Sequence, residues 1–225
     1  MTVIAIITAR ANSKGLPGKN LMQVGGVSLI SSAVRAARAS GRIDRIVVTT
    51  DGVAIAEEAR RCGAEVVMRP AHLADDGARS IDAVCHALQT LAVTHGTCVL
   101  LQPTSPLRTG DDVAEAVRIH AKSGQGSVVS VCESAHHPYK TLLLQGDEYL
   151  PLHDMSSFEA PRQFLPVAVQ LNGAIYANRI EELLTQRTFF CEPISYYLMP
   201  ASRSIDIDSE ADLVLARHLS GNNDE

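Results

Sequence analysis

Three cations crowd a glycine-rich stretch that directly follows an apolar run near the N-terminus. The stretch ARANSKGLPGKN, residues 9–20, contains Arg10, Lys14 and Lys19. Gly-rich loops after a first strand commonly hold phosphate through their backbone N–H groups, and Gly15 and Gly18 would let the backbone come close. The pattern favours binding of a polyphosphate, although a solvated basic loop would have the same composition.

This stretch lacks both common phosphate-binding motifs. GxxxxGK[ST] fails because Asn20 follows Lys19, and GxGxxG is absent. A looser design remains, in which Arg10 grips phosphate in bidentate fashion and the lysines act as point charges.

Two aspartates alternate with two isoleucines in SIDIDSE, residues 204–210. In an extended segment residues i and i+2 share a face, so Ile205 and Ile207 would face the core while Asp206 and Asp208 project together. Paired carboxylates repel unless a cation joins them, and such a pair together with substrate phosphates suits Mg²⁺. Helix capping is the alternative role for Asp208, but it leaves Asp206 unexplained.

A third polar loop, LQPTSPLRTGDD at residues 101–112, follows another apolar run. We expect it at the same ligand-binding edge as residues 9–20. The alternative is an ordinary strand-to-helix connection.

Apolar runs and amphipathic segments alternate up to residue 134. β-Branched apolar runs predict buried strands, and helical spacing of apolar residues predicts helices. Strands are expected at 3–9, 45–50, 65–70, 98–103 and 127–134. Helices are expected at 28–40, 53–62, 80–96 and 111–123. Such alternation predicts a mainly parallel α/β sheet that binds ligands at the carboxyl ends of its strands.

The alternation stops after residue 134. Residues 135–179 are irregular and rich in Pro, His and Gln, and recurring apolar and aromatic residues indicate an insertion rather than disorder. The core pattern returns with GAIYAN, RIEELLTQ and ISYYLMP.

Composition narrows the class of protein. The 225 residues suit one domain, and the formal net charge of −5 argues against a nucleic-acid binder. No apolar run approaches the roughly 20 residues of a membrane helix, and no signal peptide is evident. The five scattered cysteines form no CxxC motif, which disfavours zinc and disulfides and predicts a reduced, cytoplasmic protein.

Several motifs occur together in one order: ARANSKGLPGKN, TTDG (49–52), RP with LADD (69–76), LLQPTSPLR (100–108), HHPYKT, APRQ, NGAIY and SIDID. With them the chain closely resembles the bacterial CMP-sialic acid synthetases, or N-acylneuraminate cytidylyltransferases, over nearly its whole length. The resemblance implies a Rossmann-like nucleotidyltransferase three-layer sandwich with a mainly parallel sheet, as a single domain over 1–225. It also implies an insertion at 135–190 that forms a dimerisation subdomain.

The resemblance further implies a reaction and its cofactor. CTP and N-acetylneuraminate would give CMP-sialic acid and pyrophosphate, by in-line attack of the anomeric hydroxyl on the α-phosphate. Asp206 and Asp208 would hold Mg²⁺, for which Mn²⁺ is an expected substitute. Lys19 and Arg10 would neutralise the charge that builds on pyrophosphate.

Binding roles are implied in the same way. The expected nucleotide-binding residues are Arg10, Ser13, Lys14, Gly15, Lys19, Asn20, Arg69, Ala78 and Ser80. The expected sugar-binding residues are Gln102, Lys140, Arg162, Asn172, Tyr176, Phe189 and Phe190. Several of the second set would reach the site of the partner subunit in a homodimer. The aromatic residues could instead be core, and Arg162 a surface charge.

Two alternatives stay open. The sugar could be another 2-keto acid, such as legionaminic acid, pseudaminic acid or the eight-carbon KDO. The chain could also be a non-catalytic nucleotide-binding protein on the same fold, because a fold does not establish an activity. The intact aspartate pair and loop cations favour an enzyme.

Overall fold

The computed structural model describes residues 1–12 and 15–221. Ser13 and Lys14, two of the predicted nucleotide-binding residues, lie outside the described residues.

A seven-stranded sheet forms the middle layer, in the order β11-β7-β10-β6-β1-β4-β5. Its parallel strands are β1 (Val3–Thr8), β4 (Arg45–Thr50), β5 (Glu65–Met68), β6 (Thr97–Leu101), β7 (Ser127–Glu133) and β11 (Ile194–Leu198). β10 (Val169–Arg179) runs antiparallel to both of its neighbours, β6 and β7. The predicted mainly parallel sheet is confirmed.

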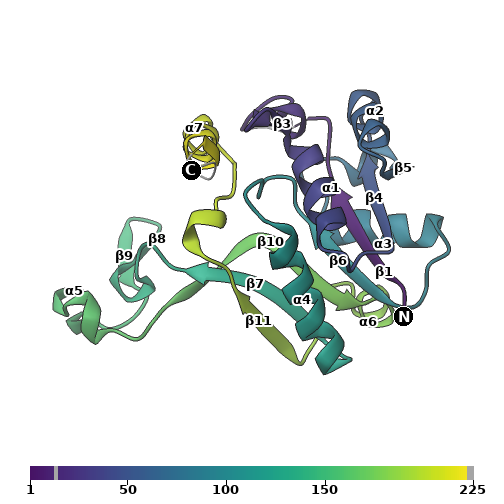
Figure 1. The fold of residues 1–225 in the computed structure, drawn as a ribbon. Helices are drawn as coiled ribbons and strands as arrows, with labels where there is room; N and C mark the ends of the chain where they lie inside the picture. Colours follow the sequence, from purple (N-terminus) through teal and green to yellow (C-terminus); the bar gives the residue numbers. More distant parts are fainter. Residues whose placement is uncertain (13–14, 222–225) are drawn as a thin grey trace.

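Helices cover both faces of this sheet (Figure 1). One face packs against α1 (Leu29–Ala39), α2 (Val53–Arg61) and α4 (Gly110–Ser123). The other packs against α3 (Ser80–Thr90) and α6 (Ile180–Gln186). Because side chains on both faces of the central strands are buried, these strands read as continuous apolar runs. The three-layer sandwich is thus confirmed.

A smaller layer closes the carboxyl edge. The helix α7 (Glu210–Gly221) packs over the short hairpin β2 (Gln23–Val24) and β3 (Val27–Ser28) in an apolar cluster that includes Leu16 and Ile207. Three-residue 3₁₀ helices link the larger elements: η1 (Lys19–Leu21), η2 (Ala71–Leu73), η3 (Pro138–Lys140), η4 (Arg162–Phe164) and η5 (Ala201–Arg203).

The helix predicted at 80–96 is shorter than expected, since α3 ends at Thr90. Ala92 adopts the left-handed conformation with φ of 52°. Its N–H bonds to Gln89 O, and Val93 N–H bonds to Leu88 O, each at about 3.0 Å or less. These two hydrogen bonds and the left-handed residue end the helix and satisfy some of its last carbonyl groups.

Residues 134–168 leave the sheet as an arm (Figure 1). The arm contains the hairpin of β8 (Leu142–Gln145) and β9 (Glu148–Pro151) and the short helix α5 (Ser156–Glu159). The predicted insertion at 135–190 is therefore too long, because β10 and α6 belong to the sandwich. The apolar pattern that returns at GAIYAN belongs to β10, so the insertion ends before this strand.

None of the helices in the described part of the chain has the length and apolar character needed to cross a bilayer. All five cysteines are free thiols.

Candidate active site

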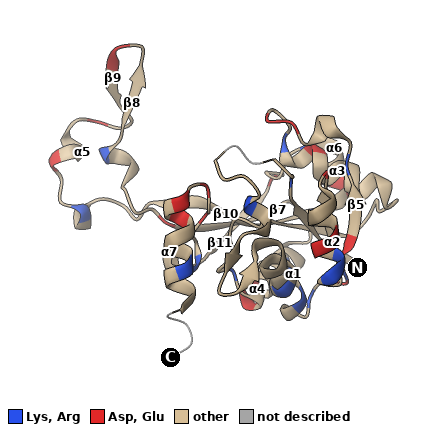
Figure 2. Cartoon of the chain, turned by 90° about the horizontal axis from the view of Figure 1, so that it is seen from above, with Lys and Arg blue, Asp and Glu red and all other residues tan. Residues whose placement is uncertain are grey.

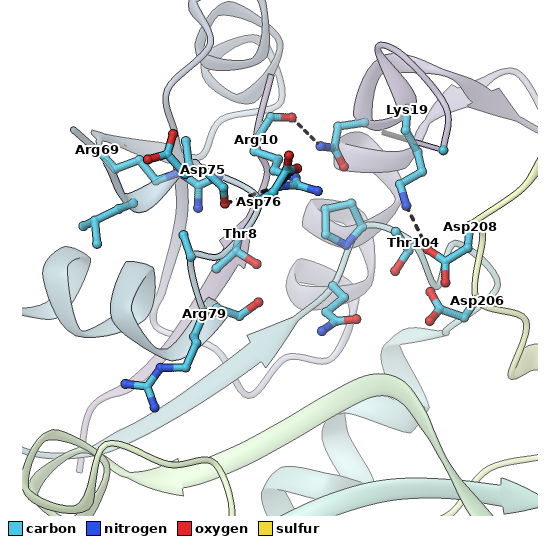
Figure 3. A pocket seen from close by; sticks show the side chains of 18 residues that line it. Thr8, Arg10, Lys19, Arg69, Asp75, Asp76, Arg79, Thr104, Asp206 and Asp208 are labelled. Atoms are coloured by element: carbon cyan, nitrogen blue, oxygen red, sulfur yellow. Dashed lines mark hydrogen bonds and ion pairs between the residues drawn. The ribbon is translucent and has the colours of Figure 1, made fainter. Parts of the chain in front are cut away.

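A cavity of about 370 Å³ opens at the carboxyl ends of β1, β5 and β6 (Figure 3). Its size suits a small-molecule ligand. Ten predicted site residues line it: Arg10, Gly15, Lys19, Asn20, Arg69, Ala78, Ser80, Gln102, Asp206 and Asp208. The sheet thus gathers residues from both ends of the chain, as expected for the carboxyl edge of an α/β sheet.

The loop after β1 is held in shape from within. Asn20 is buried, and its Nδ2 donates to Arg10 O over 2.9 Å, which ties the two ends of the loop together. Gly15 lies so close to the C-terminal segment that a Cβ there would stand 2.6 Å from Asp208 O. Any larger residue at this position would push the loop away from the aspartates.

Lys19 links the loop to the aspartate segment. Its Nζ donates to Ile207 O over 2.9 Å and lies 3.1 Å from Asp208 Oδ1. The Lys19 side chain is only 14% exposed, whereas that of Asp208 is 77% exposed, so water still screens this contact from the side of the aspartate. An ammonium group is thereby fixed beside a carboxylate that faces the pocket.

Three guanidinium groups line the pocket, those of Arg10, Arg69 and Arg79 (Figure 3). Arg10 Nη1 pairs with Asp76 Oδ1 over 3.0 Å. Arg69 is buried, with Nη2 3.8 Å from Asp51 Oδ1. Burial lowers the pKa of Arg69, and the charge of Arg10 lowers it further against the opposing effect of Asp51. Two cations that repel each other in a recess form a site that a polyanion would stabilise.

The alternation predicted for residues 205–208 is present. Ile207 is fully buried and Ile205 packs against the same cluster, whereas Asp206 and Asp208 line the pocket. The segment is extended but belongs to no sheet, and Ile207 N–H donates to Thr104 O over 2.9 Å.

Capping does not explain Asp208. The start of α7 is capped by Ser209, whose Oγ accepts from Asp212 N–H over 3.3 Å. Asp212 Oδ2 accepts in turn from Ser209 N–H over 2.8 Å. The carboxylate of Asp208 is left to contact Lys19.

Asp206 carries the more perturbed carboxyl group. Desolvation raises its pKa above the usual range, and the charge of Asp208 raises it too, whereas a hydrogen bond with Thr104 and the charge of Lys19 act in the opposite direction. The side chain is exposed by surface area, yet it faces a recess rather than open solvent. Nearby protein atoms therefore still displace much of its hydration.

The predicted sugar-binding residues lie in different parts of the chain: some in or near the sandwich, and two in the arm. Gln102 lines the pocket, whereas the aromatic residues Tyr176, Phe189 and Phe190 do not. Burial raises the pKa of Tyr176, and the charge of Asp206 raises it further. The Tyr176 ring centroid is 5.5 Å from that of Phe189 and 6.1 Å from that of Phe190. Tyr176 and Phe189 also pack in the core, as the alternative supposed, while Phe190 is exposed.

Asn172 is buried, and its amide is fully engaged inside the chain. Oδ1 accepts from Ser130 Oγ (2.6 Å) and Ala174 N–H (3.2 Å). Nδ2 donates to Ser204 Oγ (3.0 Å) and Met199 Sδ (3.3 Å).

Lys140 and Arg162 lie in the arm and do not line the pocket of their own chain. Lys140 Nζ donates to Phe158 O over 3.2 Å. Arg162 donates to Ser134 O over 2.9 Å and to Ala135 O over 3.1 Å.

The comparison with known families decides the class. The model of a family described as "Cytidylyltransferase" matches residues 4–191, which include most of the pocket. The chain belongs to the cytidylyltransferase family.

Two curated relatives illustrate the family. A CMP-N,N'-diacetyllegionaminic acid synthase of Legionella pneumophila is 36% identical over 100% of this chain and 99% of its own length. An N-acylneuraminate cytidylyltransferase of Escherichia coli is 32% identical over 95% of this chain and 51% of its own length. The chain therefore spans about half of the E. coli protein.

Solved structures agree on the fold of this cytidylyltransferase. A structure titled CMP:2-keto-3-deoxy-manno-octonic acid synthetase complexed with CTP superposes with a TM-score of 0.75 at 17% identity, covering 99% of this chain and 100% of that one. At such identity the likeness concerns the fold.

Some residues that line the cytidylyltransferase pocket were not predicted as site residues: Thr8, Asp75, Asp76, Arg79, Pro103 and Thr104. These residues could have been suspected because they lie within or beside the motifs named above. LADD contains the two aspartates, and LQPTSPLR contains Pro103 and Thr104. The motifs did not indicate which of their residues would line the pocket and which would point into the core.

Proposed function

We propose that this chain transfers CMP from CTP to a nine-carbon 2-keto acid sugar and releases pyrophosphate. The observation that carries the proposal is the pocket itself, which places cations from the β1 loop and β5 around a recess edged by Asp206 and Asp208. Membership of the cytidylyltransferase family supports the nucleotide, and the names of the relatives support the sugar class.

In the proposed reaction the triphosphate lies between Arg10 and Lys19, and the cytidine end lies toward Arg69, Ala78 and Ser80. The oxygen of the anomeric hydroxyl forms a bond to the α-phosphorus and its proton passes to solvent, as the bond from that phosphorus to the pyrophosphate oxygen breaks. Such transfers depend mostly on positioning and on charge stabilisation. Lys19 and Arg10 would stabilise the negative charge that develops on the leaving group.

We include Mg²⁺ in the proposal, with Mn²⁺ as an expected substitute. The donor set fits, because two carboxylates edge the pocket and Mg²⁺ is commonly held by one or two carboxylates together with substrate phosphates. Among the described residues no cluster of three or more His, Cys, Asp or Glu could hold a metal alone. When bound, the ion would neutralise phosphate charge and help to orient the nucleotide.

The sugar itself has two candidates. N-acetylneuraminate is the substrate that the motifs favour through their resemblance to the sialic acid enzymes. N,N'-diacetyllegionaminate is supported by the Legionella pneumophila relative, which matches this chain over nearly its whole length.

We further propose a homodimer in which the arm contacts a second copy. The arm exposes large apolar side chains, among them Leu144, Tyr149, Met155, Phe164 and Val167. It carries few charged residues along its hairpin strands (Figure 2). Exposed apolar surface of this extent marks an interaction site. Lys140 and Arg162, which do not line their own pocket, would then serve the partner's pocket.

The test is pyrophosphate release by the purified chain with CTP, Mg²⁺ and a panel of acid sugars. We expect release with at least one nine-carbon 2-keto acid and formation of its CMP derivative by mass spectrometry. Binding of CTP without release for any sugar in the panel would support the non-catalytic alternative instead. KDO as the sole substrate would overturn the proposed sugar class.

A further inference from the structure

Arg108 is a buried cation that no carboxylate pairs with at close range. It is 4% exposed, and within the described residues no carboxylate oxygen lies within 4.0 Å of it. Asp112, the acid whose charge acts on Arg108, is occupied by Arg203 through bonds of 3.0 and 2.7 Å. Burial lowers the pKa of Arg108 to about 10, with only partial compensation from Asp112. The folded state therefore bears a desolvation cost at this position.

The hydrogen bonds of Arg108 go to two backbone carbonyls. Nη1 donates to Gln102 O over 3.1 Å and to Ala174 O over 2.8 Å. Gln102 lines the pocket at the end of β6, whereas Ala174 lies in the middle of β10. A single guanidinium nitrogen thus joins two segments that lie 72 residues apart in sequence.

The β10 segment at this point is a bulge. Leu171 pairs with Val131 and Tyr176 pairs with Val129, so residues 172–175 stand opposite Ser130 alone. Ser130 Oγ accepts from Ile175 N–H over 2.8 Å and lies 2.6 Å from Asn172 Oδ1. Bulges are common beside active sites, where they re-aim side chains.

The bulge forms a wall between two functional side chains. Gly173, with φ of 71°, is placed so that a Cβ would stand 3.0 Å from Gln102 Oε1 and 3.5 Å from Asp206 Oδ2. Because Gly173 has no Cβ, the bulge can lie against Gln102 and Asp206, and its position limits where these two side chains can sit. Thr104 O, in the same loop as Arg108, also accepts from Ile207 N–H.

We propose that Arg108 is a positioning residue for the transfer reaction, because it fixes the 172–175 bulge against Gln102 and so sets the place of Gln102 relative to Asp206. This inference rests on the proposed function. Arg108 itself does not line the pocket and touches no reacting atom.

The test compares Arg108→Met, which keeps much of the volume but removes both hydrogen bonds, with Arg108→Lys, which can still donate to one carbonyl. Arg118→Met is the control, since Arg118 lies exposed on α4 and, among the described residues, its side chain pairs with Glu115 in the same helix. The readouts are thermal unfolding, CTP affinity at equilibrium, kcat/KM for the sugar that wild type accepts, and deuterium uptake of the peptide 171–177.

We expect Arg108→Met to remain folded and to bind CTP within about threefold of wild type, because the cations that face the nucleotide are unchanged. Its kcat/KM for the sugar should fall roughly 10- to 100-fold, as small displacements of positioning groups do. The peptide 171–177 should exchange faster than in wild type. Arg108→Lys should recover part of the loss, and the Arg118→Met control should match wild type.

A folded Arg108→Met variant with wild-type sugar kinetics and wild-type exchange would overturn the inference. Should that variant fail to fold, Ser130→Ala loosens the same bulge from its other side and should produce the same split between sugar kinetics and CTP affinity. A folded Ser130→Ala variant with unchanged sugar kinetics and exchange would count against the inference equally. Failure of the proposed function is distinct, because wild type itself would then release no pyrophosphate.

Discussion

At the scale of the residue, the pocket holds charged side chains that are partly withdrawn from water. Asp206 faces a recess that raises its pKa, Arg69 is buried beside a second cation, and Lys19 rests on Asp208. The burial of Asp206 and of Arg69 costs the free protein stability that a bound cation and polyphosphate would offset, whereas the contact between Lys19 and Asp208 is favourable. Substitutions here should therefore separate activity from stability.

For the aspartates, Asp206→Asn and Asp208→Asn should each lower turnover by roughly 100-fold or more, because each removes a carboxylate proposed to hold Mg²⁺. Asp206→Asn should also raise the Tm at neutral pH. A carboxyl whose folded pKa lies above its unfolded value destabilises the folded state once it is ionised, and asparagine removes that penalty.

Steady-state kinetics at limiting Mg²⁺ and thermal unfolding measure both effects. Asp111→Asn, an exposed change on α4, is the control. Near-normal turnover in both pocket variants would exclude the pair as the metal site.

For the loop, Lys19→Ala should lower kcat by roughly 100-fold and weaken CTP binding less than tenfold. The reason is that an ammonium aimed at a leaving group gains most as charge builds there. Kinetics and equilibrium CTP binding on the same preparation give the comparison. An unchanged kcat with only a raised KM for CTP would instead indicate uniform binding of substrate and transition state.

At the scale of the element, one buried carboxylate joins three segments. Asp112 completes the capping box at the start of α4 with Thr109. It also accepts from Arg203, just before the aspartate segment, and from Tyr197 Oη over 2.8 Å. Burial by itself would raise the pKa of Asp112, but hydrogen bonds from Arg203, Thr109 and Tyr197 outweigh it and hold the pKa at about 2.

This network predicts an acid-sensitive contribution to stability. Because the folded pKa is below the unfolded value, the contribution is complete above about pH 4 and is lost as the pH falls toward 2. Its size is about 2 kcal/mol, from the change in pKa. Arg203→Met should lower the free energy of unfolding at pH 7 and flatten its fall between pH 4 and 2.

Denaturant unfolding across this pH range measures how steeply the free energy of unfolding falls with pH in wild type and in Arg203→Met. Arg118→Met is the control for loss of an arginine. Equal slopes in wild type and Arg203→Met would show that Arg203 does not depress the pKa of Asp112.

At the scale of the whole molecule, the pocket of one chain accounts for only part of the proposed site. Its lining supplies cations for the nucleotide and a carboxylate pair, while Lys140 and Arg162 lie on an arm that projects from the sandwich (Figure 1). A second copy that packs on the arm would bring such cations to a pocket, where Arg162 can bind the sugar's carboxylate in bidentate fashion.

The proposed dimer predicts complementation. Arg162→Ala and Asp208→Ala should each be nearly inactive alone. When co-expressed, a mixed two-fold dimer has one site with both defects and one with neither. Random mixing makes roughly half of the dimers mixed, so activity should return to roughly a quarter of wild type. Differently tagged chains isolate the mixed dimers, and their inactivity would place Arg162 outside the partner's site.

Local pattern alone determined much of this protein. The central strands β1 and β6 were predictable because burial on both faces demands continuous apolar runs. The helices α1 and α4 were predictable from helical spacing of their apolar residues. The alternation of isoleucine and aspartate over residues 205–208 predicted which side chains would face the pocket. In an extended backbone, successive side chains point to opposite sides in any surroundings.

Other features of the site were decided only by the tertiary structure, because they depend on contacts between residues far apart in sequence. Lys19 meets Asp208 across 189 positions. The place of β10 between β6 and β7, and the bulge within it, follow from pairing with distant strands. Arg108 reads as one more polar residue of a turn-rich loop, and its role emerges only once packing buries it and directs its hydrogen bonds to Gln102 and Ala174.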